Sequence, residues 1–339
     1  MRRAYPGRVI RSSCAWIVWL FAAACTAPEG EQGASHLSSD PSIVYAEGTV
    51  ELGTLADNGD PRACLVLAQR LLTGDGMERD PERAARYLRK AADGGLPTAQ
   101  FALATLLEQG EARSDDADEA ERWYRRAAGQ GHAGAQAGLG LLLARGGAAD
   151  AEARQWLTRA AEQGDVRALS ALAAFLQRGR GGERDPVLAA DHARRAATAG
   201  DAHAQALLAQ LLLRGEGVVA DASEAARWLR SAAEQGLAVA QANLALLLLQ
   251  GNGIDADPVA AAQWFERAAV QGLATAQVKL AQLHEHGRGV ARDPVQAQIW
   301  YRRAAEQGDA GGIEGVARLA PRLDDEQRAT VEETLARPR

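Results

Sequence analysis

The chain has 339 residues, of which 47% are hydrophobic and 5% aromatic, and its formal net charge is −6. Four arginines and no acidic residue lie within the first 25 positions, so the remainder holds 34 basic against 44 acidic residues, a net charge of −10. This acidic balance argues against the class of nucleic-acid-binding proteins, which depend on basic surfaces.

Residues 1–25 have the pattern of a signal peptide of the lipoprotein type. A basic start is followed by an apolar run from Cys14 to Ala24, which is too short to span a membrane, since a spanning helix needs about 20 residues. The run ends in Ala22-Ala23-Ala24-Cys25, which resembles a bacterial lipobox in which Cys25 receives a lipid. Ala22 stands where lipoboxes usually carry Leu, so ordinary signal-peptidase cleavage after Ala24 is the alternative.

Two short segments separate the signal peptide from the main part of the chain. Residues 26–40 are small and polar without periodicity, a composition that predicts a flexible tether. Residues 41–59 place Leu52, Leu55 and Ala56 in a pattern that matches the second half of the repeat described next. We expect them to form an N-terminal capping helix.

Residues 60–308 consist of seven similar segments. They begin at Asp60, Leu96, His132, Asp165, Asp201, Leu237 and Leu273. Six are 36 residues long, and the third has 33 because three residues are missing around Gly146-Gly147. A fixed period of this length indicates a solenoid, because one helical hairpin cannot bury its apolar stripes alone and must stack on the next.

The last segment, residues 273–308, shows why each unit should form two helices. Apolar residues at helical spacing over 276–283 and again over 297–305 predict two amphipathic helices. Between them, Gly287-Arg288-Gly289 ends the first helix, because glycine adopts a left-handed backbone at little cost. Asp293-Pro294 then starts the second helix with a capping carboxylate and a proline suited to the first turn.

The chain continues beyond the last repeat. Ile313, Val316 and Leu319 predict a short helix, and the polar segment 324–336 predicts a terminal one. We expect residues 309–339 to supply C-terminal capping helices.

The aligned segments share A-Q-x-x-L near the start, then G-x-G-V and D-P, and A-x-x-W-[YF]-x-x-A-A-x-x-G at the end. This pattern resembles the Sel1-like repeat, a relative of the tetratricopeptide repeat. In the last segment it is carried by Ala276, Gln277, Leu280, Gly287, Gly289, Val290, Asp293, Pro294, Ala297, Trp300, Tyr301, Ala304, Ala305 and Gly308.

The resemblance covers roughly residues 45–320 and implies an all-α fold. That fold is a right-handed α-α superhelical solenoid of about seven 36-residue helix-turn-helix repeats with terminal capping helices. It also implies a scaffold that assembles protein complexes or acts in bacterial envelope and signalling pathways. A cysteine-rich branch of the family is linked to cell-wall-type ligands, but this chain lacks the paired cysteines of that branch.

Motifs of catalysis or metal binding are missing from the sequence. His284 and His286 are two residues apart and so point to different sides of a helix, which makes a poor metal pair. Neither CxxC, HExxH nor GxxxxGK[ST] occurs, and no Ser has Lys three residues later. Cys64 is a lone thiol where other repeats carry Gln. We therefore expect no enzymatic activity, no cofactor and no metal site.

The inner face of the superhelix, lined by first helices, is the candidate binding surface. Stacking should set side chains at equivalent positions next to one another, which suits an extended peptide. The candidate peptide-binding residues are Arg145, Arg178, Arg214, Gln250, Asn243 and Lys279. The alternative is that these are solvated helix ends, where arginine favours the negative end of the helix dipole.

The sequence thus favours a noncatalytic protein-protein interaction scaffold or adaptor of the bacterial cell envelope. It would be monomeric, lipid-anchored and facing the periplasm, with a protein or peptide partner and no nucleic acid. A soluble periplasmic or secreted form is the alternative location. The alternative function is a binder of a cell-wall fragment or other small ligand that regulates an envelope enzyme.

The anchor can be tested with Cys25→Ser. If Cys25 is lipidated, this change removes the thiol that carries the lipid, and the protein should move from the membrane fraction to the soluble fraction. Immunoblots of fractionated cells measure the shift. An unchanged distribution would show that the lipobox interpretation is wrong.

Overall fold

The computed structural model describes residues 49–110 and 117–336, and this part of the chain forms 17 α-helices and one short 3-10 helix, with no strand. The expected signal peptide (1–25), the tether (26–40) and Cys25 lie outside the described residues. The all-α class expected from the repeat pattern is confirmed.

Each repeat contributes a first and a second helix. The first helices are α4 (Pro61–Thr73), α6 (Pro97–Glu108), α8 (Ala133–Ala144), α10 (Val166–Arg178), α12 (Ala202–Arg214), α14 (Ala238–Gln250) and α16 (Ala274–His286). The second helices are α5 (Pro81–Asp93), α7 (Ala117–Gly129), α9 (Asp150–Glu162), α11 (Pro186–Thr198), α13 (Ala222–Glu234), α15 (Pro258–Val270) and α17 (Pro294–Ala305). The remaining elements are α3 (Thr49–Asp57), α18 (Ala310–Leu319), the 3-10 helix η2 (Ala320–Arg322) and α19 (Asp325–Ala336).

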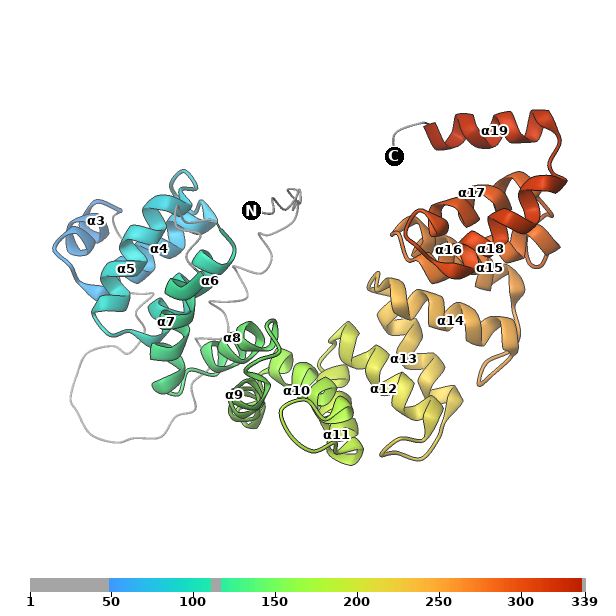
Figure 1. Ribbon diagram of the computed structural model, residues 1–339. Helices are drawn as coiled ribbons and strands as arrows, with labels where there is room; N and C mark the ends of the chain where they lie inside the picture. The colour runs from blue at the N-terminus through green and yellow to red at the C-terminus, as the bar shows by residue number, and fades with distance from the viewer. Residues whose placement is uncertain (1–48, 111–116, 337–339) are drawn as a thin grey trace. The chain divides into compact units, whose positions relative to one another are not determined.

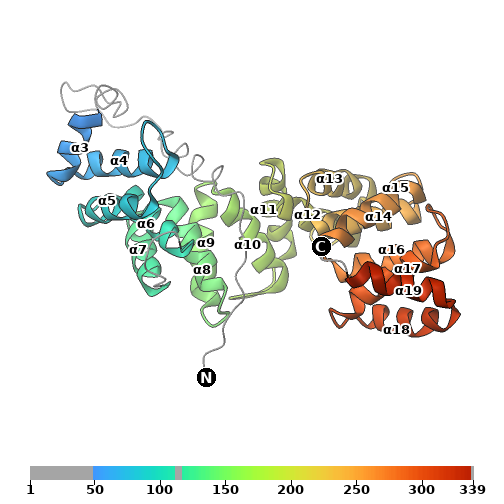
Figure 2. The same cartoon turned by 90° about the horizontal axis from the view of Figure 1, so that it is seen from above.

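The chain divides into two compact units, residues 1–165 with α3–α9 and residues 166–339 with α10–α19. Within each unit, the two helices of a repeat lie side by side, and each second helix packs against the first helix of the next repeat (Figures 1 and 2). Each unit is therefore a stack of helical hairpins, which is the arrangement of a helical solenoid.

The helix ends follow the capping pattern of the sequence. The Asp80 carboxylate accepts a hydrogen bond from the Arg83 amide at 2.8 Å, and Asp293 accepts one from the Gln296 amide at 2.9 Å. Asp185, Asp221 and Asp257 cap their helices in the same way. First helices end in left-handed glycines, with φ of +64° to +78° at Gly74, Gly215, Gly251 and Gly287.

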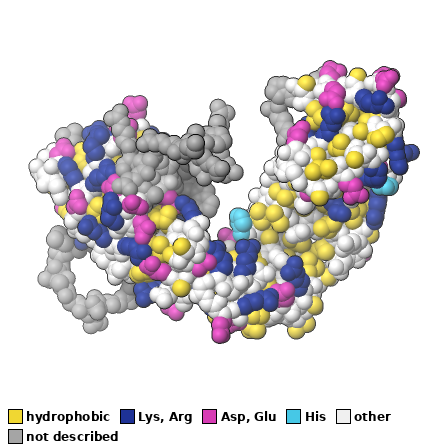
Figure 3. All heavy atoms as spheres, viewed as in Figure 1, with side chains coloured by type: hydrophobic (Ala, Val, Ile, Leu, Met, Phe, Trp, Pro, Cys, Tyr) yellow, Lys and Arg dark blue, Asp and Glu magenta, His cyan; other side chains and the backbone are white. Residues whose placement is uncertain are grey.

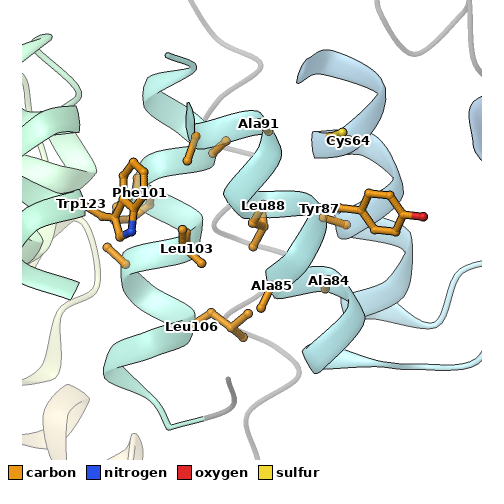
Figure 4. Packing of buried hydrophobic residues seen from close by; sticks show 14 of the residues in the cluster. Cys64, Ala84, Ala85, Tyr87, Leu88, Ala91, Phe101, Leu103, Leu106 and Trp123 are labelled. Carbon is orange, nitrogen blue, oxygen red and sulfur yellow. The ribbon is translucent and has the colours of Figure 1, made fainter. Parts of the chain in front are cut away.

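Small side chains pack against large ones in the core of each unit. In the first unit Ala84, Ala85, Leu88 and Ala91 of α5 are buried, as is Leu103 of the neighbouring α6 (Figure 4). Alanine lets the helices approach closely, and leucine and aromatic side chains fill the space that remains. The packing expected from the repeat pattern is present in both units.

A buried glutamine joins successive hairpins within each unit. These glutamines are 5% exposed or less: Gln100, Gln136, Gln205, Gln241 and Gln277. Each amide nitrogen donates to the carbonyl of an alanine eight residues earlier, at the end of the preceding second helix, over 3.0–3.3 Å. Each amide oxygen accepts from a glutamine at the end of its own repeat, over 2.7–3.0 Å. The buried amides are thus satisfied on both sides.

Two repeats lack this glutamine. In the first, Cys64 is fully buried and its Sγ lies 3.2 Å from the carbonyl oxygen of Ala56, again eight residues earlier, so the thiol takes the place of the amide. Burial raises the pKa of the Cys64 thiol, which makes it a poor nucleophile at neutral pH. In the fourth repeat, Leu169 and Ala199 replace both members of the glutamine pair.

Second helices are linked by a recurring contact of arginine, glutamate and tryptophan. Arg89 forms an ion pair with Glu119 of the next repeat at 3.2 Å, and the indole nitrogen of Trp123 donates to Glu119 at 3.3 Å. The same contact joins Arg125, Glu152 and Trp156 in the first unit and Arg194, Glu224 and Trp228 in the second. Much of the charge on these helices is therefore paired between neighbouring repeats.

The G-x-G loops also connect repeats. Gly289 has φ +74°, and a Cβ there would overlap the carbonyl oxygen of Pro258 at the start of α15 in the preceding repeat. Gly217 faces Pro186 in the same manner. The second glycine of the loop is needed both for its backbone conformation and for this close contact.

Helices outside the repeats cover apolar residues at both ends of the described chain. Leu52 and Ala56 of α3 are buried, and α3 packs against α4. At the other end, Leu323 and Val331 pack on Ile299 of α17. These helices shield core residues that a bare hairpin would expose.

The loop contact can be tested by comparing Gly289→Ala with Gly308→Ala. Both glycines have positive φ, +74° and +79°, but no atom lies within 4 Å of a Cβ built at Gly308. We expect Gly308→Ala to cost about 1–2 kcal/mol for the left-handed backbone and Gly289→Ala about 1–3 kcal/mol more for the overlap. Urea denaturation measures both, and equal losses would contradict the contact.

Candidate functional site

A groove of about 1030 Å³ near the C-terminal end of the second unit is lined by residues of α14, α16, α17 and α18. We call it the C-terminal groove. It is lined by Leu249 and Gln250 of α14, Lys279 and His286 of α16, Tyr301 of α17 and Arg318 of α18, together with their neighbours. Because α18 follows α17 as a first helix would follow a second, the groove lies along the first-helix face of the stack.

The structure brings two of the candidate residues together and places the other four elsewhere. Gln250 and Lys279 both line the C-terminal groove. Asn243 is half-buried in α14 and does not line it, and Arg178 and Arg214 are exposed at the ends of α10 and α12. Arg145 belongs to the first unit, so it is not part of this groove.

A buried ionic network forms one wall of the groove. Glu285 is 9% exposed, and the Tyr301 hydroxyl donates to it at 2.8 Å. The Arg318 guanidinium bonds both oxygens of the same carboxylate, at 2.8 and 2.9 Å. A bidentate arginine and a hydroxyl together satisfy a carboxylate that would otherwise be costly to bury. Arg318 and Tyr301 are thereby held in fixed positions.

Burial and the neighbouring Glu285 carboxylate raise the pKa of Tyr301 to about 12. The phenol thus keeps its proton throughout the physiological range and remains a hydrogen-bond donor to Glu285. Gly315 of α18 permits this arrangement, because a Cβ there would overlap the Tyr301 ring.

A related network occurs in the first unit. The Tyr124 hydroxyl donates to Glu108 at 2.7 Å and lies 3.2 Å from the Thr105 hydroxyl, and Arg145 forms an ion pair with Glu108. Arg145 is therefore bound to a carboxylate of its own chain. The role of Arg145 in peptide binding stays a prediction.

Sequence reasoning missed these networks, although a signal was present. Glu and Tyr occur together at one pair of repeat positions, as Glu108 with Tyr124 and as Glu285 with Tyr301, and the other repeats carry neither residue there. Paired occurrence of a buried acid and a phenol indicates a contact between them. Arg318 could not be found in this way, because α18 does not follow the repeat pattern.

The groove also carries cations that make no ion pair with a carboxylate among the described residues. Lys279 Nζ donates to Gln282 Oε1 at 3.3 Å, and Arg288 Nη2 donates to the Leu249 carbonyl oxygen at 2.8 Å. Elsewhere, basic and acidic side chains are interspersed on the face of each unit seen in Figure 3. The groove thus combines positive charge, side-chain amides and apolar surface, a mixture that is typical of ligand-binding sites.

Two further findings concern the described part of the chain. No group of three or more His, Cys, Asp and Glu side chains is placed there to hold a metal ion. None of its helices has the length and hydropathy of a membrane span.

Stacked helical hairpins define a class of protein, the helical-repeat solenoids. Within that class, seven segments match the family described as Sel1 repeat: residues 61–96, 97–132, 133–165, 166–201, 202–237, 238–273 and 274–309. The chain therefore belongs to the Sel1 repeat family. Proteins of this family are generally protein-interaction scaffolds and are typically noncatalytic.

Solved structures show the same relationship. The chain is similar to c5321, a protective antigen of uropathogenic Escherichia coli with an SLR fold, at 34% identity and a TM-score of 0.68 over 83% of this chain. It spans 62% of that protein's length. A Sel1 repeat protein from Oxalobacter formigenes is 27% identical with a TM-score of 0.60, over 88% of this chain and 99% of the other. No curated protein matches the chain.

The network of Tyr301 predicts a pH dependence of stability. In the unfolded chain tyrosine ionises near a pKa of about 10, whereas Tyr301 in the folded protein does so at about 12. Between these values the folded state holds a proton that the unfolded state has lost, so its stabilising effect is complete below pH 10 and disappears as pH rises through 12.

Tyr301→Phe should remove this contribution. We expect the free energy of unfolding to fall less steeply above pH 10 in the variant than in the wild type. At pH 8 the variant should be less stable by about 1–3 kcal/mol, because Glu285 loses a hydrogen bond. Denaturant unfolding at pH 8 and at pH 11.5 measures both effects, and identical slopes in the two proteins would contradict the assignment.

Proposed function

We propose that this chain is a noncatalytic interaction scaffold of the bacterial cell envelope that binds a segment of another protein in the C-terminal groove. The observation that supports this most strongly is the groove itself. Residues of α14 to α18 present leucines, amides and cations along one channel. Family membership supports a protein partner over other ligands, because Sel1 repeat proteins are generally interaction scaffolds.

The shape and chemistry of the groove suit a peptide. Leu249 supplies apolar contact, and the amides of Gln250 and Gln282 can each donate to and accept from a peptide backbone. The Arg318–Glu285–Tyr301 network keeps one wall rigid, which lowers the entropy lost on binding.

The envelope location rests on residues 1–25. Their signal-peptide pattern supports export, and the proposed lipid on Cys25 would hold the protein at a membrane, facing the periplasm. The Escherichia coli relative is described as a protective antigen, which agrees with a location at the cell envelope for this chain. If signal peptidase cleaves the chain and no lipid is attached to Cys25, the protein would instead be soluble in the periplasm.

Site-specific photo-crosslinking in the native cell tests the binding function. A photoreactive residue replaces Gln250 in the groove, and the matched control replaces Val270, which is 70% exposed on α15 and does not line the groove. We expect a protein adduct at Gln250 that is missing at Val270, identified by mass spectrometry.

The outcome separates the candidate functions. Adducts of equal yield at both positions, or none at Gln250, would contradict the groove as a protein-binding site. Retention of the purified protein on cell-wall sacculi, together with no protein adduct, would favour a binder of cell-wall fragments. Repeating the crosslink with Arg178→Glu and Arg214→Glu shows whether those exposed arginines contribute.

A further inference from the structure

The charges in the C-terminal groove are unbalanced. Lys279 and Arg288 are exposed, and their hydrogen bonds go to a neutral amide and to a backbone carbonyl. Arg318 is the third cation, but the buried Glu285 neutralises it. Glu314 is the one acidic side chain among the lining residues. The groove therefore carries a net positive charge within a chain whose formal charge is −6.

Several other arginines of the second unit, in contrast, form ion pairs with acidic side chains. Arg184 pairs with Glu216, Arg194 with Glu224 at 2.8 Å, and Arg302 with Glu332 at 2.6 Å. In most of these contacts the arginine and the acid come from different repeats. Lys279 and Arg288, which form no ion pair with an acid among the described residues, are available to an acid of another protein.

Apolar surface lies within the same groove. Leu246 and Leu249 of α14 are only half-buried, and Leu283 of α16 adjoins them in the lining. Leucine side chains left partly open beside two cations can receive an aliphatic side chain while a neighbouring carboxylate meets the positive charge. His286 is held by its bond to the Gln282 carbonyl at 2.8 Å and borders the cations.

We infer that the C-terminal groove recognises an acidic segment of a partner protein in which Asp or Glu lies next to an aliphatic residue. Lys279 and Arg288 receive the carboxylates, and the half-buried Leu246 and Leu249 receive the aliphatic side chain. This inference rests on the proposed function and adds the chemistry of the partner.

The test is selection of a phage-displayed library of random 12-residue peptides on the purified protein. We expect enrichment of peptides with Asp or Glu beside Leu, Ile, Val or Phe. The variant Lys279→Gln with Arg288→Gln should lose this enrichment. The matched control is Arg227→Gln with Arg230→Gln, because both arginines are exposed on α13 of the same unit and the change in net charge is equal. Circular dichroism verifies the fold of each variant.

An enriched peptide then gives the affinities by fluorescence anisotropy. The double groove variant should bind about tenfold more weakly, since two partly exposed ion pairs are lost. Glu314→Gln removes the opposing carboxylate and should bind about two- to threefold more tightly. Enrichment without acids, no enrichment at all, or equal losses in the groove and control variants would overturn the inference.

The crosslinking experiment distinguishes this inference from the proposed function. If the photoreactive residue at position 250 still captures the partner when Lys279 and Arg288 are replaced by glutamine, the groove binds protein but does not select acidic segments. Only the inference is then wrong. If the photoreactive residue at position 250 captures nothing when Lys279 and Arg288 are unchanged, both the proposed function and the inference are wrong.

Discussion

The architecture depends on the requirement that every hairpin bury its apolar stripes against the next one, with its buried polar groups satisfied at the same time. In five of the seven first helices a buried glutamine meets both demands. Gln241, for example, bonds the Ala233 carbonyl of the preceding helix and the Gln271 amide of its own repeat. An unpaired amide at such a buried position would be costly, so these bonds fix how far one hairpin slides along its neighbour. The buried alanines determine the distance between neighbouring helices, and the glutamine amides determine the register of one hairpin against the next.

Fixed register is what gives the C-terminal groove its composition. Because successive first helices stack without sliding, Leu249 of α14 and Lys279 of α16 face the same channel although they are 30 residues apart. The wall formed by the Arg318–Glu285–Tyr301 network does not follow from register alone, because Arg318 must extend from α18 to bond Glu285 and Tyr301. Gly315 makes that approach possible by leaving room for the Tyr301 ring.

Most of the fold could be predicted because its determinants are local and repeated. Helix ends follow from Asp caps and left-handed glycines, and the core follows from the periodicity of alanine and leucine. The groove could be predicted only in part. Gln250 and Lys279 occupy regular repeat positions, and stacking alone brings them together.

The rest depends on contacts that no single segment encodes. Arg145 forms an ion pair with Glu108 of the previous repeat, so its position in an aligned column did not reveal its partner. Arg318 lies outside the repeats altogether. Side chains that act between neighbouring repeats, or between the repeats and a terminal helix, can be located only once the packing is known.

The glutamine bonds and the G-x-G loop contacts reach no further than the adjacent hairpin. A whole hairpin gained or lost upstream of α14 would therefore leave the groove's own contacts intact, since these come from α14 to α18 alone. Within this architecture, descendants of one gene could vary in length by recombination between repeats without any change in the residues that line the C-terminal groove.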